Sequence, residues 1–454
     1  MTELSYLAAG VLFIVGLKGL TSPRTARRGN QLAALGMLLA IIVIVVDLIA
    51  KDAAMAWGIV IAGVVVGGAI GAVLAVRIKM TSMPELVAAF NGFGGGASAL
   101  VAAGIIVTTS GNLPNETAAT TALSIIIGSL TLTGSFIAFG KLRGLITGRP
   151  LSIGGASTNA AIAVIAVALG VIAVVTGEPL AYWGAASVAA VLGVVVVLGI
   201  GGADMPVAIS LLNSMSGVAA AMAGFVIANQ ALIVGGALVG AAGMILTIEM
   251  SVAMNRSIAN ILFSEFGGGA PAEDFEAKPV HRATPDDAAI ALGYATRVIV
   301  VPGYGLAVAQ AQHAVRDLAN ALEARGVEVL YAIHPVAGRM PGHMNVLLAE
   351  ADIPYDKLLD LEQANPLFPQ TDVVLIVGAN DVVNPAAKTD PDSPIFGMPV
   401  LNVDEASTVI VVKRSLSPGY AGIDNPLFYE DSTLMFFADA KKAIDATTAA
   451  LARV

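Results

Sequence analysis

Long apolar runs dominate the first 255 residues of the chain, and short polar loops separate them. Nine runs have about the length that a helix needs to cross a bilayer, roughly 20 residues. They lie near residues 4–20, 31–50, 54–76, 83–109, 116–140, 156–175, 181–200, 204–228 and 231–253. The pattern predicts a bundle of nine transmembrane helices. Because Glu3 replaces a basic leading segment, we interpret the first run as a retained helix and not a signal peptide.

The second half of the chain has a different pattern. Residues 263–290 are polar and punctuated by Gly and Pro, which is typical of a linker. Beyond them, β-branched runs alternate with helical patterns, and this alternation predicts an α/β Rossmann-like domain with a six-stranded parallel sheet. The six strands are expected near 297–301, 327–333, 372–377, 399–403, 408–412 and 433–437. We therefore divide the chain into a membrane domain (1–262), the linker, and a soluble domain (291–454).

Composition supports this division. The chain is 56% hydrophobic and 13% charged, with a mean hydropathy of +0.82, which excludes a purely soluble protein. It has no cysteine, which excludes disulfides and thiolate metal sites. Residues 1–270 hold 11 Lys and Arg against 9 Asp and Glu, whereas the remainder holds 13 against 24. The acidic second half, without a basic run, excludes nucleic acid as a partner.

The loop charges predict the orientation of the membrane domain. The odd-numbered loops hold eight basic residues and the even-numbered loops hold only Lys51. The eight are Arg24, Arg27, Arg28, Arg77, Lys79, Lys141, Arg143 and Arg149. Basic loops stay in the cytoplasm, so the N-terminus is expected outside and the soluble domain in the cytoplasm.

Small and polar residues interrupt several predicted helices. Gly63, Gly67 and Gly71 repeat every four residues and are expected to serve helix packing. Polar groups are costly in hydrocarbon and tend to face a bundle interior or a wet cavity. Those of interest are Glu85, Asn91, Ser135, Asn159, Asp204, Asn213 and Glu249.

Four of these groups suggest a polar path from the cytoplasm. Glu85 and Asp204 lie at the inner mouths of the fourth and eighth helices. Asn91 and Asn213 follow six and nine residues later, roughly 9 to 14 Å deeper. The alternative is that each amide only bonds a neighbouring helix.

A glycine turn directly follows the first predicted strand of the soluble domain. Gly303-Tyr304-Gly305 precedes Val308 and an amphipathic helix expected to reach about residue 324. In such a turn glycine permits close backbone approach to a pyrophosphate, and the helix N-terminus offers free N–H groups to the anion. Because Val308 fills the third small position, a purely structural turn remains the alternative.

The choice of nucleotide depends on two strand ends. The second strand ends Tyr331-Ala-Ile-His-Pro335 without the carboxylate that commonly binds the ribose of NAD. Lys413, Arg414 and Ser415 follow the strand near 408–412 and offer two cations and a hydroxyl to a 2′-phosphate. This favours NADP over NAD, and a solvated Lys-Arg pair is the alternative.

Three longer motifs carry a resemblance to a known family. They are His334-Pro-Val-Ala-Gly-Arg-Met-Pro-Gly-His343, Gly378-Ala-Asn-Asp-Val-Val-Asn-Pro385 and the run from Lys413 to Pro426. With Met83-Pro-Glu-Leu-Val87 and Met254-Asn-Arg256, they closely resemble the beta subunit of proton-translocating NAD(P) transhydrogenase over essentially the whole chain. The resemblance implies an oxidoreductase that moves hydride from NADH to NADP⁺ while a proton moves inward.

The resemblance also implies cofactors, partners and location. NADP(H) would bind this chain, and NAD(H) would bind an alpha subunit that adds further membrane helices. A dimer of the complex in the bacterial cytoplasmic (inner) membrane is expected. The implied nucleotide contacts are Gly303, Tyr304, Gly305, Val308, Val336, Ala337, Gly338, Arg339, Met340, Pro341, Gly378, Ala379, Asn380, Asp381, Val382, Gly397, Met398, Lys413, Arg414, Ser415, Gly419, Tyr420, Asp439 and Ala440.

Particular roles follow by similarity. Lys413, Arg414 and Ser415 would hold the 2′-phosphate, the loop around Tyr420 would close as a lid, and Asp381 would lie near the nicotinamide. Glu85, Asn91, Ser135, Asp204 and Asn213 would belong to the proton path.

One departure from the family matters. Many relatives carry histidine where this chain has Asn91, and all four histidines here lie in the soluble half. An amide does not titrate near neutral pH, so the proton carrier is expected on the alpha subunit. A secondary transporter with a redox-sensing nucleotide domain is the alternative function; a one-chain NADPH-dependent reductase is disfavoured because no haem, flavin or quinone motif is present.

Overall fold

The computed structural model describes residues 2–20, 23–50, 57–78, 82–147, 150–151, 153–254, 257–263, 279–338, 342–393, 395–419 and 421–454. The chain divides into two compact units. The first comprises Met1–Ile200 and Ala208–Leu246, and the second comprises Gly201–Val207 and Thr247–Val454.

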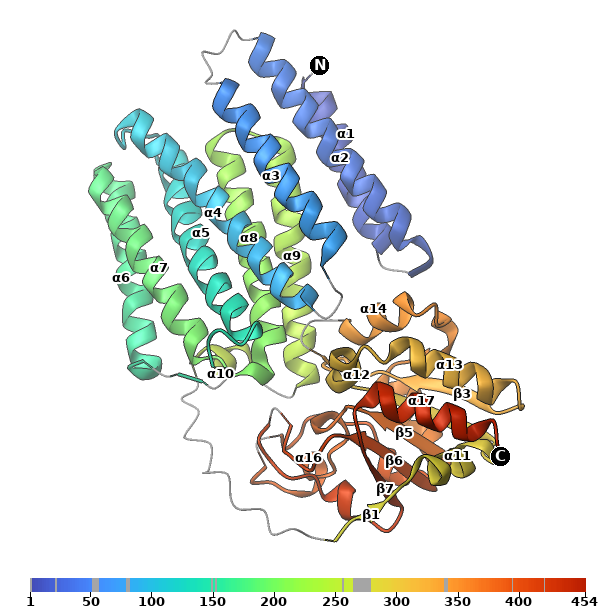
Figure 1. Ribbon diagram of the computed structural model, residues 1–454. Helices are drawn as coiled ribbons and strands as arrows, with labels where there is room; N and C mark the ends of the chain where they lie inside the picture. Colours follow the sequence, from blue (N-terminus) through green and yellow to red (C-terminus); the bar gives the residue numbers. More distant parts are fainter. Residues whose placement is uncertain are drawn as a thin grey trace. The chain divides into compact units, whose positions relative to one another are not determined.

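The nine predicted apolar segments are helices in the described residues (Figure 1). Eight of them are long and apolar enough to cross a membrane, and the first contributes the shorter apolar helix Leu4–Leu20. The bounds are α1 Thr2–Leu20, α2 Pro23–Ala50, α3 Trp57–Arg77, α4 Met83–Thr109, α5 Asn115–Leu142, α6 Gly155–Thr176, α7 Pro179–Gly199, α8 Met205–Val226 and α9 Gln230–Ala253. A short α10 (Ile258–Phe263) follows. The expectation of a helical membrane domain is confirmed.

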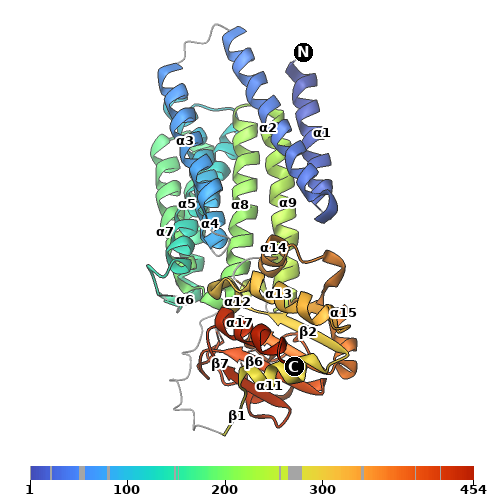
Figure 2. The ribbon, with the colours of Figure 1, turned by 45° about the vertical axis from the view of Figure 1, so that its right-hand side comes forward.

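Small residues bring the helices of the first unit into contact. A Cβ on Gly95 of α4 would lie 2.7 Å from the Thr131 side chain of α5, and one on Gly217 of α8 would lie 2.9 Å from the Gly240 Cα of α9. Figure 2 shows α8 and α9 side by side. By contrast, no described atom lies within 4 Å of a Cβ built on Gly63, Gly67 or Gly71. Helix packing, expected for this stripe, is therefore not made within the described residues.

The second unit carries a seven-stranded parallel sheet. Its strands are β1 His281–Arg282, β2 Arg297–Pro302, β3 Glu328–Ala332, β4 Leu358–Leu359, β5 Val373–Val377, β6 Thr408–Lys413 and β7 Thr433–Phe437. The order is β1-β7-β6-β5-β2-β3-β4. From β7 to β4 this is the strand order of a dinucleotide-binding fold, and the order reverses between β2 and β5, whose strands remain parallel. The predicted α/β fold class is confirmed.

Two details of the predicted sheet need correction. Residues 399–403 form no strand, although Val400, Leu401 and Val403 are buried. Pro399 has no N–H for a ladder, and the Leu401 N–H donates to the Val382 carbonyl, so the run is apolar because it packs under the sheet. β1 and β4 were missed because strands of two residues carry no periodicity.

Helices α11 (Pro285–Gly293), α13 (Gln312–Glu323) and α17 (Ala440–Leu451) pack together. A separate apolar cluster joins alternate residues of the central strands, such as Ile299, Val374 and Val409, to Phe368 and Phe428. These two packed regions hold the strand ends in place. The remaining helices of this unit are α12 (Tyr304–Ala309), α14 (His343–Glu350), α15 (Leu361–Ala364) and α16 (Ala386–Thr389).

The predicted linker ends earlier than residue 290. β1 starts at His281, and Thr284 begins α11 with a capping box. The Asp287 N–H donates to Thr284 Oγ1 (3.2 Å), and the Thr284 N–H donates to Asp287 Oδ2 (2.8 Å). Thr-Pro-Asp-Asp is therefore a helix start, for which Pro at the first position is favourable. Residues 264–278 lie outside the described part.

Candidate functional site

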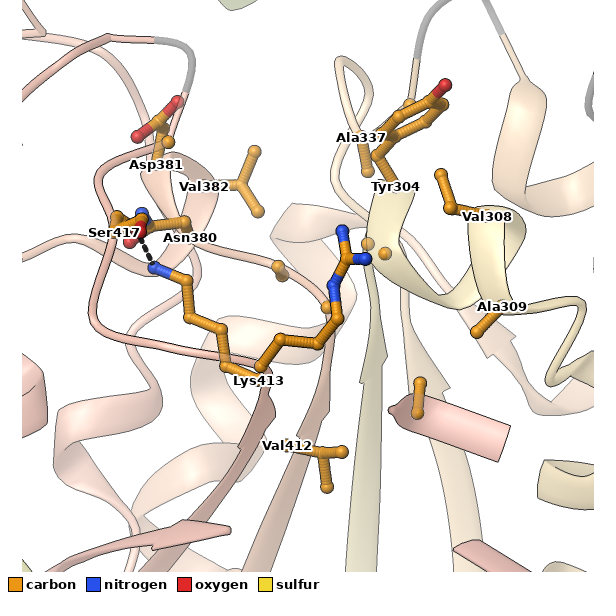
Figure 3. Close-up of a pocket in the computed structure, with 18 of the residues that line it drawn as sticks. Tyr304, Val308, Ala309, Ala337, Asn380, Asp381, Val382, Val412, Lys413 and Ser417 are labelled. Carbon is orange, nitrogen blue, oxygen red and sulfur yellow. Dashed lines mark hydrogen bonds between the residues drawn. The ribbon is translucent and has the colours of Figure 1, made fainter. Parts of the chain in front are cut away.

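A cleft of about 450 Å³ opens at the carboxyl ends of the parallel strands. Five chain segments line it, each following a strand: 303–309 after β2, 336–338 after β3, 378–382 after β5, 412–419 at the end of β6, and 438–440 after β7. Ligands bind at such a position in open α/β sheets, where the strand order switches. Figure 3 shows Tyr304 and Val308 on one wall and Asn380 and Asp381 on the other.

The predicted glycine turn meets a second glycine turn. The Gly303 N–H donates to the Val377 carbonyl (2.9 Å), and the Gly305 N–H donates to the Gly378 carbonyl (3.0 Å). A Cβ on Gly305 would lie 2.7 Å from Gly378 Cα, and Gly378 itself has φ +69°. Glycine is required here because two backbones touch, and the N–H groups of Gly303 and Gly305 are already used.

The helix after this turn is shorter than expected. α12 ends at Ala309, and Gln310 adopts a left-handed conformation with φ 51° before α13 begins at Gln312. The prediction of a single amphipathic helix to residue 324 is therefore wrong. The large dipole of a long helix is not aimed at the cleft from this position.

The basic end of β6 separates into two environments. Arg414 and Ser415 are exposed, and the Arg414 guanidinium forms no ion pair within the described residues. The Lys413 ammonium donates to the Ser417 carbonyl (2.5 Å) and lies 4.8 Å from the centre of the Phe428 ring. A free guanidinium and a hydroxyl at a strand end suit a phosphate ester.

The segment after β6 folds back onto the loop after β5. The Ala421 N–H donates to Asp381 Oδ2 (3.1 Å), and a Cβ on Gly419 would lie 2.7 Å from the same oxygen. Asp381 thus contacts the backbone of the predicted lid.

The structure brings most of the predicted nucleotide contacts into this one cleft. Arg339, Met340, Pro341 and Tyr420 lie outside the described residues. Gly397 and Met398 do not line the cleft; Met398 packs with Ala387 and Val400 instead. Beyond the contacts expected above, the cleft is also lined by Ala309, Val412, Ser417, Pro418 and Ala438, and all of these except Ser417 directly adjoin an expected residue.

Comparison with known proteins agrees with this geometry. The family described as the NAD(P) transhydrogenase beta subunit matches residues 2–450. Two relatives named NAD(P) transhydrogenase subunit beta, both from Rhodospirillum rubrum, are each 46% identical over 477 aligned residues, which cover 97% of this chain and 97% of the relative. The chain belongs to the NAD(P) transhydrogenase beta subunit family. It is therefore a membrane-embedded subunit of an oxidoreductase.

In this beta subunit, two predicted membrane residues, Asn91 and Ser135, lie where α4, α5 and α8 meet. Asn91 is buried and donates to the Ile209 carbonyl of α8 (3.3 Å). A Cβ on Gly94 would lie 2.6 Å from Ser216 Oγ. Asn213 falls on the same helical stripe as these two α8 positions, since they are spaced by four and three residues.

Ser135 of α5 faces the same region. It is fully buried, and a Cβ on Gly92 of α4 would lie 3.2 Å from its Cβ. Its hydroxyl has no hydrogen-bond partner within the described residues, nor does Glu85 Oε2 or Asn159 Oδ1. Asp204 is buried, whereas Glu249 is exposed. That Asn91 and Asn213 line a polar path stays a prediction.

His334 is a site residue whose individual role was not predicted. Its side chain is 2% exposed; Nε2 lies 2.6 Å from the Pro399 carbonyl, and the Val336 N–H donates to Nδ1 (3.2 Å). A carbonyl only accepts, so Nε2 carries a proton. Nδ1 accepts from the Val336 N–H and therefore carries none, so the ring is neutral. His334 therefore connects the cleft segment at Val336 to the segment that follows Met398.

His334 predicts an acid-sensitive stability of the soluble unit. Burial lowers its pKa to about 4 from the ordinary 6.5, although the bond to Pro399 opposes this shift. Between these values the unfolded chain binds a proton that the folded chain does not. Stability is therefore complete above pH 6.5 and falls by up to about 3 kcal/mol as the pH decreases to 4.

Thermal unfolding of the intact purified complex from pH 7.5 to 4 measures this effect. In His334→Gln the unfolding temperature is expected to fall less between pH 6.5 and pH 4 than in the wild type. His313→Gln, at an exposed position, should show the same fall as the wild type. If the unfolding temperature of His334→Gln fell with pH as much as that of the wild type, His334 would not be the source of the acid sensitivity.

Proposed function

We propose that this chain is the NADP(H)-binding and membrane subunit of a proton-translocating NAD(P) transhydrogenase. Hydride would pass from NADH on an alpha subunit to NADP⁺ on this chain while a proton moves inward. The observation that carries the proposal is the cleft with exposed Arg414 and Ser415 at the end of β6, on a chain that also holds buried amides in apolar helices.

The cleft fits NADP(H) by three features. The crossing of Gly305 and Gly378 leaves a wall without side chains for a pyrophosphate. Arg414 and Ser415 would bind the 2′-phosphate, and Asp381 would lie toward the nicotinamide. When bound, the cofactor supplies the ring carbon that accepts or donates hydride, while the protein excludes water and fixes the ring.

The proposed coupling has a sufficient driving force. The two nicotinamide cofactors carry the same reacting ring, so hydride exchange between them is nearly balanced. One charge that crosses about 100 mV supplies about 2.3 kcal/mol, or about a fiftyfold shift in the ratio of products to reactants. One proton per hydride would therefore keep NADPH abundant.

The proposed proton path enters through the interface of α4, α5 and α8. A buried hydroxyl such as that of Ser135, for which the described residues provide no hydrogen-bond partner, is costly unless water reaches it. Asn91 and Asn213 can bind water but cannot carry a proton themselves. We infer that the alpha subunit supplies the titrating group, and that a dimer of the complex lies in the bacterial inner membrane with this chain's N-terminus outside.

The decisive experiment uses the purified complex of this chain and its partner in sealed vesicles. NADH-dependent reduction of NADP⁺ is expected to accelerate when the imposed gradient drives protons toward the side of the membrane that carries the soluble domain. A protonophore should abolish this acceleration. An unchanged rate of NADP⁺ reduction with and without the gradient would refute coupling. If the complex exchanged no hydride at all, a redox-sensing transporter would be favoured.

Asn213→Leu tests the path separately. Loss of the amide is expected to slow proton-linked turnover about tenfold, because water loses a hydrogen-bonding partner at the helix interface. NADPH affinity should stay within about twofold of the wild type. Asn112→Leu, the same change in the exposed loop between α4 and α5, is the control. Unchanged coupling in Asn213→Leu would support the packing alternative.

A further inference from the structure

The Lys413 side chain is directed at the loop that follows β5. Lys413 is the last residue of β6 and pairs with Phe437 of β7, whereas Arg414 lies beyond the strand. Figure 3 shows the Lys413 side chain running toward Asn380 and Ser417. The Lys413 ammonium is therefore held by protein groups, whereas the Arg414 guanidinium forms no ion pair within the described residues.

The Lys413 ammonium contacts a segment that lines the cleft through Ser417, Pro418 and Gly419. We name residues 416–419, together with Ala421, the lid loop. Lys413 Nζ donates to the Ser417 carbonyl (2.5 Å) of this loop. With the Asn380 amide oriented so that its oxygen accepts, Asn380 also receives bonds from Lys413 Nζ (3.1 Å) and from the Gly419 N–H (2.7 Å). The same ammonium thus connects the lid loop to the loop after β5.

A third contact closes this arrangement. The Ala421 N–H donates to Asp381 Oδ2 (3.1 Å), next to Asn380 in sequence. Asn425 holds Asn380 from the other side, through Nδ2 and the Asn380 carbonyl (3.3 Å). The lid loop is therefore attached at Ser417, Gly419 and Ala421, and Lys413 supplies the attachment nearest to the strand.

The Lys413 ammonium is engaged by protein groups on more than one side. The ammonium lies over the Phe428 ring at 4.8 Å, a distance at which a cation is attracted to the ring face. Burial lowers the pKa of Lys413 to about 8, while Asp381 and Asp424 act in the opposite direction. Arg414, in contrast, is exposed and has no ion pair within the described residues.

We propose that Lys413 is a positioning residue that fastens the lid loop over the cleft, and that recognition of the 2′-phosphate rests on Arg414 and Ser415. The inference depends on the proposed NADP(H) site, but it assigns Lys413 to retention of the nucleotide and not to discrimination between NADPH and NADH. Retention affects both nucleotides equally, because both share the parts that the lid loop would cover.

The test compares Lys413→Met, Arg414→Met and the control Arg453→Met in the purified complex. The Arg453 side chain lies outside the cleft and forms an exposed ion pair with Asp286. The first measurement needs no nucleotide: hydrogen exchange of a peptide that spans the lid loop. Lys413→Met is expected to exchange about tenfold faster than the wild type, whereas the other two variants should match the wild type.

The second measurement compares affinities for NADPH and NADH. Lys413→Met is expected to weaken both by the same factor and to accelerate NADPH release about tenfold. Arg414→Met should instead narrow the NADPH-to-NADH affinity ratio. Lys413→Arg, which keeps a cationic donor, should recover much of the slow exchange and so separates the effect from misfolding.

Two results would overturn the inference: unchanged exchange of the lid loop in Lys413→Met, or a narrowed affinity ratio like that of Arg414→Met. If Lys413→Met does not fold, Asn380→Ala, which removes the contact to Gly419, must still accelerate exchange of the lid loop. If the wild-type complex binds no NADP(H), the proposed function fails, and the exchange measurement still decides whether Lys413 fastens the loop.

Discussion

Replacing Arg414 with alanine is expected to weaken NADPH binding by about 30- to 150-fold. The exposed guanidinium has no ion pair within the described residues, so it is available to a 2′-phosphate. Hydrogen bonds to a charged group contribute about 2 to 3 kcal/mol, which corresponds to this range of affinity. NADH lacks the phosphate, so its weaker binding should change by less than about threefold.

Titration of the purified complex with NADPH and with NADH measures both affinities. Arg316→Ala removes an arginine of α13 that pairs with Asp317, outside the cleft, and should leave both affinities as in the wild type. Arg414→Lys is expected to fall between wild type and alanine, since lysine keeps the charge and loses the bidentate geometry. Equal losses of NADPH and NADH in Arg414→Ala would remove the assignment.

Gly378→Ala is expected to abolish measurable NADPH binding and to destabilise the soluble unit. The residue has φ +69°, a conformation that costs an alanine roughly 1 to 2 kcal/mol. Its new Cβ would also lie 2.6 Å from the Leu306 nitrogen, so the two glycine turns must separate. Separation would break the bond from the Gly305 N–H to the Gly378 carbonyl and displace the wall of the cleft.

Gly326→Ala provides the matched control, because Gly326 has φ +87° and no atom of the described residues lies within 4 Å of a Cβ built on it. It should show the conformational cost alone: a lower unfolding temperature with NADPH affinity within about twofold of the wild type. Thermal unfolding and NADPH titration of both variants separate the cost of a positive φ from the effect of the clash between the two glycine turns. If Gly378→Ala binds NADPH as well as Gly326→Ala does, the crossing of the turns is not required.

These predictions depend on different levels of information. The cluster of Lys413, Arg414 and Ser415 at a strand end was apparent from sequence, because the β-branched run that predicts the strand ends where these polar residues begin. The direction of each side chain was not apparent. For Lys413 it depends on where β6 ends, and Lys413 pairs with Phe437 of β7, 24 residues further along the chain.

The glycine turn shows the same division. Its position and its need for glycine were predictable from Gly303-Tyr304-Gly305 after an apolar strand. The reason was different from the one expected, since the turn touches Gly378 from a strand more than 70 residues away. Likewise, Thr284-Pro-Asp-Asp287 contains a capping box that local spacing could have revealed, but its polar composition suggested a linker.

The amino-acid sequence by itself determined the nine apolar helices, the parallel α/β domain and the segments that meet in the cleft, because hydrophobic periodicity and turn residues act over short distances along the chain. Only the tertiary structure decided that Met398 lies away from the cleft, that His334 connects two segments, and that Lys413 reaches the lid loop. The physical reason is that these contacts join residues far apart in sequence, so they are fixed by the packing of strands and loops and leave no local pattern.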